Sequence, residues 1–441
     1  MNTEIKIFIK RLLNIVKLQD NTVTEFWNNR ELTQMHIELT NACNAACPMC
    51  VRFHNNSPLT RPDLEIGQIT IDKFKEYFPP HIIKKCNLIL FCGVHGDPCV
   101  AKDMYEICEY IDSVSKNTAV RINTNGGMRK SEWWSKLGKL FSKHPRNKDA
   151  YWSVTFSIDG LEDTNHLYRR NVNWKILTDN VTSFINAGGT AMWDYLIFKH
   201  NEHQIIEAQQ LANTLGFTEF IPKKALGVDQ GNKLKPLPVL DKNGQLDYVI
   251  EAPVEAKNRN LENPEGVEPL KFYPFKLEDY RKLKIEKSVG KNFQQQVSSV
   301  YETRILLEDN TKYNNCNINC KSKVWQGGKE IFVDNFGRVM PCCYVGTHLN
   351  GVYTDTRTLQ LHKHMNDYGW DKFDLNNHSL EEILDQGHLD RVFADSWKKD
   401  TVEGGRLSYC ADTCGVHSSI DRIFTHEIND KTVSRKQKST F

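Results

Sequence analysis

The sequence lacks the features that mark membrane-spanning, secreted and polyanion-binding proteins. No uninterrupted apolar run reaches the ~18 residues that a membrane-spanning helix needs. Charges interrupt the amino-terminal stretch where a signal peptide would have its apolar core. Lysine and arginine number 57 against 55 aspartates and glutamates, so no charge of one sign dominates. These absences exclude a membrane span and weigh against nucleic acid as a partner.

Cysteine, in contrast, is abundant: the 441 residues include 13 cysteines. An odd count in a long chain does not fit a secreted disulfide scaffold, which is normally short and has an even count. Thiolates are soft ligands that select zinc, copper(I) or iron–sulfur clusters. The cysteines therefore predict metal or cluster sites in a cytoplasmic protein. Apolar residues make up 39% of the chain, which is enough for a sizeable core.

Residues 31–225 alternate short β-rich runs with helical stretches. Such repeated units predict a parallel sheet with helical crossovers. The β-rich runs are Met35–Leu39, Asn87–Phe91, Ala119–Asn123, Trp152–Ile158, Met192–Phe198 and Phe217–Pro222. The helical stretches include Asp103–Ser113, Trp174–Ala187 and Glu202–Leu215, and the second and third precede glycines of the kind that end helices.

The remaining chain divides by composition into four further segments. An amphipathic, cationic pattern predicts a helix near the amino terminus, which we expect to pack on the main domain and not on a membrane surface. Six of the 15 prolines fall between 226 and 275, where Asp241–Gln245 predicts the turn of a small hairpin. The four segments are an N-terminal helix and lead-in (1–30), a Pro-rich insertion with a helix (226–308), a Cys-rich domain (309–425) and a basic tail (426–441).

The first cysteine cluster directly follows the first predicted strand. Cys43, Cys47 and Cys50 form a CxxxCxxC loop, in which three thiolates can converge on one centre. On a four-iron cube, three thiolates leave one iron open, and an open position is where a metal site does chemistry. The alternative is a structural zinc site with His36 or His54 as fourth ligand. The carboxyl ends of barrel strands, however, are where active sites gather.

This loop resembles the signature of the radical S-adenosylmethionine superfamily, with Met49 where the family usually has an aromatic residue. The resemblance implies that the three cysteines hold a [4Fe-4S] cluster whose open iron is chelated by S-adenosylmethionine. It further implies reductive cleavage of that cofactor to a 5′-deoxyadenosyl radical, which removes a hydrogen atom from substrate, with an electron donor such as flavodoxin or ferredoxin.

Later strand ends carry the same resemblance, over about residues 35–225. Gly96-Asp97-Pro98 is similar to the end of the family's Gly-Gly-Glu-Pro stretch, and Ser157–Gly160 to its Ser-Ile-Asp-Gly segment. A small-residue turn lets a carboxylate approach the cofactor's ammonium group, and an arginine suits its carboxylate. The implied cofactor contacts are Gly96, Asp97, Pro98, Asn123, Asn125, Ser157, Asp159, Arg169, Arg170 and Asn201.

A second cysteine set resembles the SPASM or twitch extension that follows many radical enzymes. It surrounds a predicted β-hairpin over Glu330–Val339 and a predicted helix over Ser379–Gln386. The family's full pattern has seven cysteines; six are present here, and two closed four-iron clusters would need eight. We therefore expect one auxiliary [4Fe-4S] cluster, or a structural zinc site as the alternative. The expected ligands are Cys320, Cys342, Cys410 and Cys414, with Cys316 and Cys343 as substitutes.

Neighbouring residues on a strand face opposite ways, so only one of Cys342 and Cys343 is expected to be a ligand. The other cysteines, Cys86, Cys92, Cys99 and Cys108, show no ligand spacing and are expected mainly to pack in the core.

The sequence thus predicts an α/β fold: a partial (β/α)6 TIM-like barrel followed by a small α+β Cys-rich domain. The resemblance implies a radical enzyme acting on a peptide, protein or small molecule. Two alternatives stay open: a non-catalytic zinc or iron–sulfur scaffold, and a tRNA-modifying radical enzyme. The only basic run that could bind tRNA in the second alternative consists of Lys223, Lys224, Lys233 and Lys235.

Overall fold

The computed structural model describes residues 26–27, 31–62, 64–230, 232–282, 310–320, 322, 329–349 and 356–415. The amino-terminal helix expected within 1–30, the part beyond residue 282 of the helix expected over 276–308, and the basic tail lie outside these ranges. A search of the described helices for one that is long and apolar enough to cross a membrane finds none.

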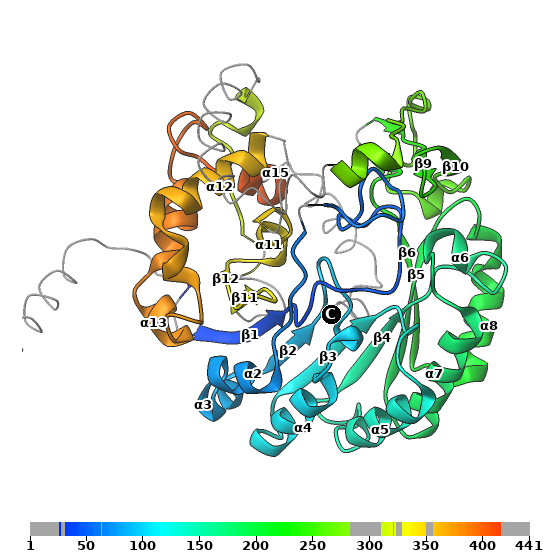
Figure 1. Cartoon of the computed structure of the whole chain (residues 1–441), viewed down its shortest axis with the longest axis horizontal. Helices are drawn as coiled ribbons and strands as arrows, with labels where there is room; N and C mark the ends of the chain where they lie inside the picture. The colour runs from blue at the N-terminus through cyan, green and yellow to red at the C-terminus, as the bar shows by residue number, and fades with distance from the viewer. Residues whose placement is uncertain are drawn as a thin grey trace, which may run out of the picture.

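Six parallel strands form the core sheet, in the order of the chain, and confirm the predicted partial barrel. Figure 1 shows them curving into an open arc with helices on the outer side. The strands are β1 (Leu32–Ile37), β2 (Leu88–Phe91), β3 (Ala119–Thr124), β4 (Ser153–Ser157), β5 (Ala191–Ile197) and β6 (Glu219–Lys224). Since all six carboxyl ends lie at one edge, the loops that follow them meet there.

Helices cover the outer face of the arc because each presents an apolar side to the strands (Figure 1). They are α2 (Ile71–Tyr77), α3 (Pro80–Lys85), α4 (Met104–Val114), α5 (Ser131–Phe141), α6 (Asn165–Tyr168), α7 (Trp174–Asn186) and α8 (Ile205–Leu215). Gly216 ends α8 with φ +88°, the left-handed cap that the sequence predicted. The next strand therefore begins at Glu219, two residues later than predicted, and includes Lys223 and Lys224.

The C-terminal hairpin extends this same sheet. Its strands, β11 (Lys329–Val333) and β12 (Val339–Met340), are antiparallel as predicted, and Gly337 adopts φ +85° in the turn. The sequence did not predict that β11 would run parallel to β1, with His36 opposite Phe332. The sheet thus has eight strands in the order β12-β11-β1-β2-β3-β4-β5-β6.

Smaller elements complete the fold. The predicted hairpin pairs β9 (Leu237–Leu240) with β10 (Leu246–Ile250), and α13 (Leu380–Asp385) carries the predicted capping box between Ser379 and Glu382. The other helices and strands are α11 (Cys343–Leu349), α12 (Thr356–Tyr368), α14 (Asp395–Trp397), α15 (Ser408–Cys414), β7 (Asp229–Gln230) and β8 (Lys233–Leu234). Short helical turns occupy Pro98–Val100, Glu202–Gln204, Ala256–Asn258, Thr311–Tyr313, Trp370–Phe373 and Asp390–Ala394.

Candidate cofactor and iron–sulfur sites

The thiols of Cys43, Cys47 and Cys50 lie together in the loop that follows β1. Burial raises the pKa of all three thiols, and each is raised further by the charge of at least one carboxylate or thiolate among its neighbours. For Cys50 the pKa rises to about 11, with Cys47 the second cause after burial. Buried thiols in one small volume become thiolates when a cation binds, so this donor set fits an iron–sulfur cluster.

Two side chains from later segments of the chain reach these sulfurs. Asn125, after β3, donates from Nδ2 to Cys43 Sγ at 3.6 Å and to the Asn44 side chain at 2.9 Å. Arg169, after α6, places Nη1 at 3.7 Å from Cys47 Sγ. Hydrogen-bond donors around a ligating sulfur stabilise its thiolate form. Segments far apart in the sequence therefore converge on the cysteine loop.

The turn after β2 packs tightly against that loop. A Cβ on Gly96 would lie 1.9 Å from the carbonyl oxygen of Thr40, so only glycine permits this approach. Asp97 is 5% exposed and accepts hydrogen bonds from Thr124 Oγ1 at 2.8 Å and from the Asn125 amide at 2.7 Å. Burial raises its pKa although these hydrogen bonds oppose the rise. Both Asp97 oxygens thus accept hydrogen bonds from the chain itself, and Oδ2 positions Asn125.

The carboxylate of Asp159 also binds other groups of the same chain. It is fully buried and forms an ion pair with Arg169, whose Nε lies 2.5 Å from its Oδ2. Its Oδ1 accepts the Leu196 amide at 2.6 Å. Burial raises the pKa of Asp159, whereas Arg169 lowers it. The carboxylate that the resemblance assigns to cofactor contact therefore orients the arginine beside Cys47.

The other predicted cofactor residues divide into two groups. Asn201 and Arg170 bind backbone: Asn201 Nδ2 donates to the carbonyls of Asp159 and Leu196, both at 2.9 Å. Arg170 donates to the carbonyl of Ala46 at 2.8 Å and also reaches two other carbonyl oxygens.

The second group of predicted cofactor residues consists of Pro98, Ser157 and Asn123. Pro98 opens a short helical turn, and Ser157 ends β4. Asn123 Nδ2 lies 3.6 Å from Cys92 Sγ, and its buried Oδ1 has no hydrogen-bond partner within the described ranges.

Four of the six C-terminal cysteines line one small cavity. Cys320, Cys342, Cys410 and Cys414 form it together with aromatic side chains that include Tyr344, Trp397 and Tyr409. The pKa of the Cys320 thiol is raised first by its contact with Cys414 and then by burial. The pKa of Cys342 is raised first by burial and then by the charges of its neighbours Cys343, Cys414 and Cys410. These are the four thiols that the sequence assigned to an auxiliary cluster.

The two remaining C-terminal cysteines lie elsewhere. Burial raises the pKa of Cys343, and the next contributions come from Glu330 and Cys92, so its sulfur lies on the barrel side of α11. Cys316 accepts a hydrogen bond from Arg406 Nη2 at 3.3 Å and lines a different cavity. Cys342, and not Cys343, therefore joins the four-thiol cavity.

The proposed fourth ligands for a zinc site have other partners. His36 Nε2 lies 2.8 Å from the Cys92 carbonyl oxygen, and the His54 ring packs edge-on against Phe275 with centroids 4.9 Å apart. Across the described ranges, no three His, Cys, Asp or Glu side chains are grouped closely enough for a single metal ion, and this holds for both cysteine sets as well. Of the basic run, Lys223 pairs with Asp194 and Lys235 with Glu268.

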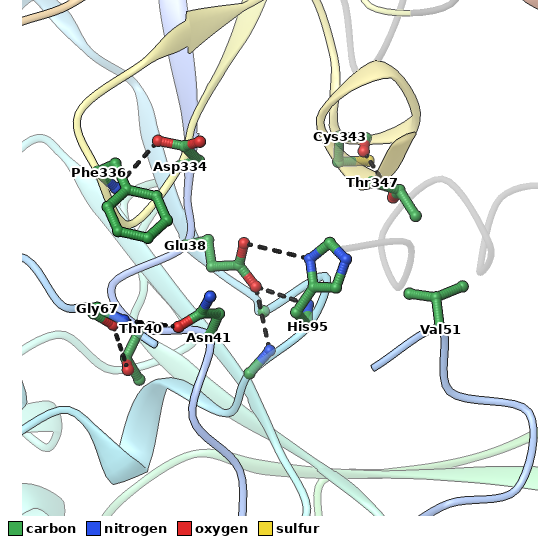
Figure 2. Close-up of polar contacts among 12 residues, drawn as sticks. Glu38, Thr40, Asn41, Val51, Gly67, His95, Asp334, Phe336, Cys343 and Thr347 are labelled. Atoms are coloured by element: carbon green, nitrogen blue, oxygen red, sulfur yellow. Dashed lines mark hydrogen bonds and ion pairs between the residues drawn. The ribbon is translucent and has the colours of Figure 1, made fainter. Parts of the chain in front are cut away.

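Sequence reasoning missed one buried pair at this site, Glu38 and His95. Glu38 follows β1, and its Oε1 accepts the backbone amides of His95 at 2.6 Å and Gly96 at 3.1 Å (Figure 2). The pair thereby ties the turn after β2 to the start of the cysteine loop. A glutamate next to a buried strand, where an apolar residue would be expected, was the available signal.

Comparison with protein-family models gives no match, and comparison with curated proteins gives none either. Solved structures similar to this chain include SuiB of Streptococcus suis bound to S-adenosylmethionine, at 13% identity and TM-score 0.39, covering 71% of this chain and 61% of that one. Native anSMEcpe with bound AdoMet has 14% identity and TM-score 0.43, with 92% and 100% covered. BtrN in complex with AdoMet and 2-DOIA has 12% identity and TM-score 0.36, with 86% and 92% covered. The chain thus spans 61% of the length of SuiB.

Proposed function

We propose that the protein is a radical S-adenosylmethionine enzyme that removes a hydrogen atom from a peptide or small-molecule substrate. The observation that carries this proposal is the convergence of the Cys43, Cys47 and Cys50 thiols at the carboxyl edge of a parallel partial barrel. Asn125 and Arg169 contact two of these sulfurs, and they come from the segments after β3 and β4, both of which resemble family motifs.

The chain's own residues would hold and shield the reacting centre. Cys43, Cys47 and Cys50 would bind a [4Fe-4S] cluster, which, when bound, supplies the electron that cleaves S-adenosylmethionine. Asn125 and Arg169 would stabilise the thiolates by donating toward sulfur. The buried carboxylates of Asp97 and Asp159 fix those two donors, so that they are in place before any cofactor enters.

A second cluster would occupy the cavity lined by Cys320, Cys342, Cys410 and Cys414. Four thiolates are the full protein ligand set of a closed [4Fe-4S] cluster, which suits electron transfer more than substrate activation. Tyr409 and Trp397 line the same cavity and would exclude water from it. An external carrier such as flavodoxin or ferredoxin would supply the electrons.

The decisive experiment is anaerobic reconstitution of the full chain with iron and sulfide. We expect about eight irons per chain, cluster absorption, and dithionite-dependent formation of 5′-deoxyadenosine from S-adenosylmethionine. Cys43→Ala should lose about four irons and all cleavage, whereas Cys410→Ala should lose the other cluster and keep cleavage. The matched control is Cys316→Ala, which should keep both clusters.

Three results would contradict the proposal. A colourless protein containing stoichiometric zinc would favour a structural scaffold. Bound clusters without any cofactor cleavage would favour a non-catalytic iron–sulfur protein. Salt-sensitive binding of tRNA together with cleavage that depends on tRNA would assign the substrate to nucleic acid instead.

A further inference from the structure

A cavity of about 810 Å³, which the proposed reaction does not use, lies beside the C-terminal cysteine set. Its volume is within the range of about 300–1,000 Å³ that is typical of small-molecule sites. Ile318 and Trp397 line both this cavity and the four-thiol cavity, so the two share a wall. The cysteine and the cationic residues that line the larger cavity are Cys316, Lys329, Lys398, Lys399 and Arg406.

The guanidinium of Arg406 is buried in the wall of this cavity without a carboxylate partner. Arg406 is 3% exposed, and within the described ranges it forms no ion pair and its Nε has no hydrogen-bond partner. Its Nη1 donates to two uncharged acceptors, the carbonyl oxygens of Trp397 at 3.0 Å and Lys399 at 2.6 Å. A buried charge needs an opposite charge to compensate for its lost hydration. That charge must come from Cys316 or from a molecule in the cavity.

The thiol of Cys316 lies directly beside this guanidinium. Arg406 Nη2 is 3.3 Å from Cys316 Sγ, and the Tyr313 carbonyl oxygen, 3.5 Å from the same sulfur, accepts the S–H of the neutral thiol. Cys316 is partly exposed and lines the cavity, whereas burial raises the pKa of the neighbouring thiols of Cys342 and Cys410. Reactive thiols lie in partly exposed, electropositive surroundings of this kind.

The charges that line the cavity determine which molecules it attracts. Lys329 and Lys398 each pair with a carboxylate. Within the described ranges, Lys399 and Arg406 form no ion pair, and of the lining carboxylates Asp400 is the one that forms none. Two unpaired cations thus oppose one unpaired anion, so an anionic molecule is attracted to the cavity more strongly than a neutral or cationic one.

We propose that Cys316 is a modification site for small disulfides that carry carboxylates. The Cys316 thiolate, whose proton has passed to water, attacks one sulfur of the disulfide. A bond forms between Cys316 Sγ and that sulfur, the S–S bond of the molecule breaks, and the other sulfur leaves as a thiolate with the electron pair. The Cys316 sulfur is oxidised and the leaving sulfur is reduced, so the step needs no further reactant. Arg406 is the positioning residue that stabilises the attacking thiolate, and Lys399 attracts the carboxylate.

The test compares three aliphatic disulfides of similar size on the reconstituted full-length protein. They are dithiodipropionate, which is anionic, hydroxyethyl disulfide, which is neutral, and cystamine, which is cationic. Peptide mass mapping follows the adduct at each cysteine over time in the absence of air. We expect Cys316 to react first, and about tenfold faster with dithiodipropionate than with cystamine. The difference should disappear in about 1 M salt, where charges are screened beyond roughly 3 Å. Equal rates with all three disulfides, or no adduct at Cys316, would overturn the inference.

Charge variants separate the cavity from the general surface of the protein. Lys399→Glu should abolish the preference for dithiodipropionate. Lys139→Glu makes the same charge change at an exposed residue of α5 that does not line the cavity, and should leave the preference unchanged. Equal effects of the two variants would contradict the assignment of the cavity.

Arg406→Gln tests the positioning residue. It removes the charge beside Cys316 and should slow the reaction with all three disulfides, because the thiolate loses its stabilising partner. Circular dichroism checks that this variant is folded, and if it is not, Lys399→Glu decides the question. A folded Arg406→Gln protein that reacts as fast as the wild type would contradict the role of Arg406. Because mapping reads Cys316 separately from the other cysteines, absent clusters or absent cofactor cleavage would count against the proposed function and leave this test valid.

Discussion

At the scale of single residues, buried ion pairs and hydrogen bonds between the chain's own groups hold the candidate cofactor site in shape. These interactions form without any cofactor. Asp159 and Arg169 are the clearest case, because the carboxylate is fully buried and the guanidinium lies beside Cys47 Sγ. Burial opposes the charge on Asp159, and Arg169 is the main group that compensates for it. The same carboxylate also fixes the Leu196 amide.

Removing one member of this pair should therefore destabilise the fold. Arg169→Met should cost about 3–5 kcal/mol of unfolding free energy, since it leaves a buried charge without its partner. The double variant Arg169→Met/Asp159→Asn should recover part of that loss. Urea unfolding of the four proteins in a double-mutant cycle measures the coupling. A loss in the double variant equal to the sum of the two single losses would show no coupling, and hence that the ion pair does not hold this loop.

Glu330 gives a pH-dependent prediction. Burial raises its pKa from about 4.5 to about 7. Between these pH values the folded protein binds more protons than the unfolded chain, so stability falls as pH rises and then stays level above about 7. Glu330→Gln removes this penalty and should be more stable at pH 8 by up to roughly 3 kcal/mol. Unfolding at pH 5.5 and pH 8 checks it; a gain that does not grow with pH would contradict the shift.

At the scale of elements, glycines set how closely neighbouring segments approach the two thiol sets. A Cβ on Gly346 of α11 would lie 2.3 Å from Phe332 of β11, a ring that is fully buried and cannot move aside. Gly96 has the same role against Thr40 in the cysteine loop. At each proposed cluster site, a glycine thus holds a loop or helix in position.

Alanine at each glycine should therefore damage one site only. Gly346→Ala should push α11 off the hairpin, lose about four irons with Cys342 displaced, and keep cofactor cleavage. Gly96→Ala should do the reverse and abolish cleavage while retaining the C-terminal iron. Iron content, absorption and 5′-deoxyadenosine formation, measured on both variants, distinguish the two cases. Loss of both clusters in both variants would contradict separate positioning.

At the scale of the whole molecule, the C-terminal hairpin and the barrel share one sheet. The backbone of β1 pairs with β2 on one side and β11 on the other, and the Glu38 amide donates to the Val333 carbonyl at 2.9 Å. The loop that carries Cys43, Cys47 and Cys50 therefore starts from a strand covered on both sides. Loss of β11 would leave β1 as an exposed edge strand.

Truncation tests this dependence. A chain that ends at residue 282 should aggregate or stay unreconstituted, because β1 would present an unpaired edge and Glu38 would lose its strand neighbour. Size-exclusion chromatography and iron content measure the effect, and Cys410→Ala in the full chain is the control for loss of the C-terminal cluster alone. A soluble truncated monomer that binds about four irons would contradict it.

The sequence by itself determined the features that depend on local pattern. Strand and helix alternation, the Gly216 cap, both hairpins and the Ser379 capping box all follow from spacing over a few residues. The cysteine spacing likewise separated the two thiol sets. Local periodicity determines these features because side-chain direction repeats every two residues in strands and about every 3.6 in helices.

Only the tertiary structure decided which distant groups meet. It placed β11 beside β1 and put Cys342, not Cys343, in the four-thiol cavity. It also paired the side chains of Asp97, Asp159 and Arg170 with other groups of the same chain. It also brought Glu38 and His95 together with unsatisfied atoms. Sheet partners and buried polar contacts depend on residues far apart in sequence, and no local pattern records which of several acceptors a buried donor will reach.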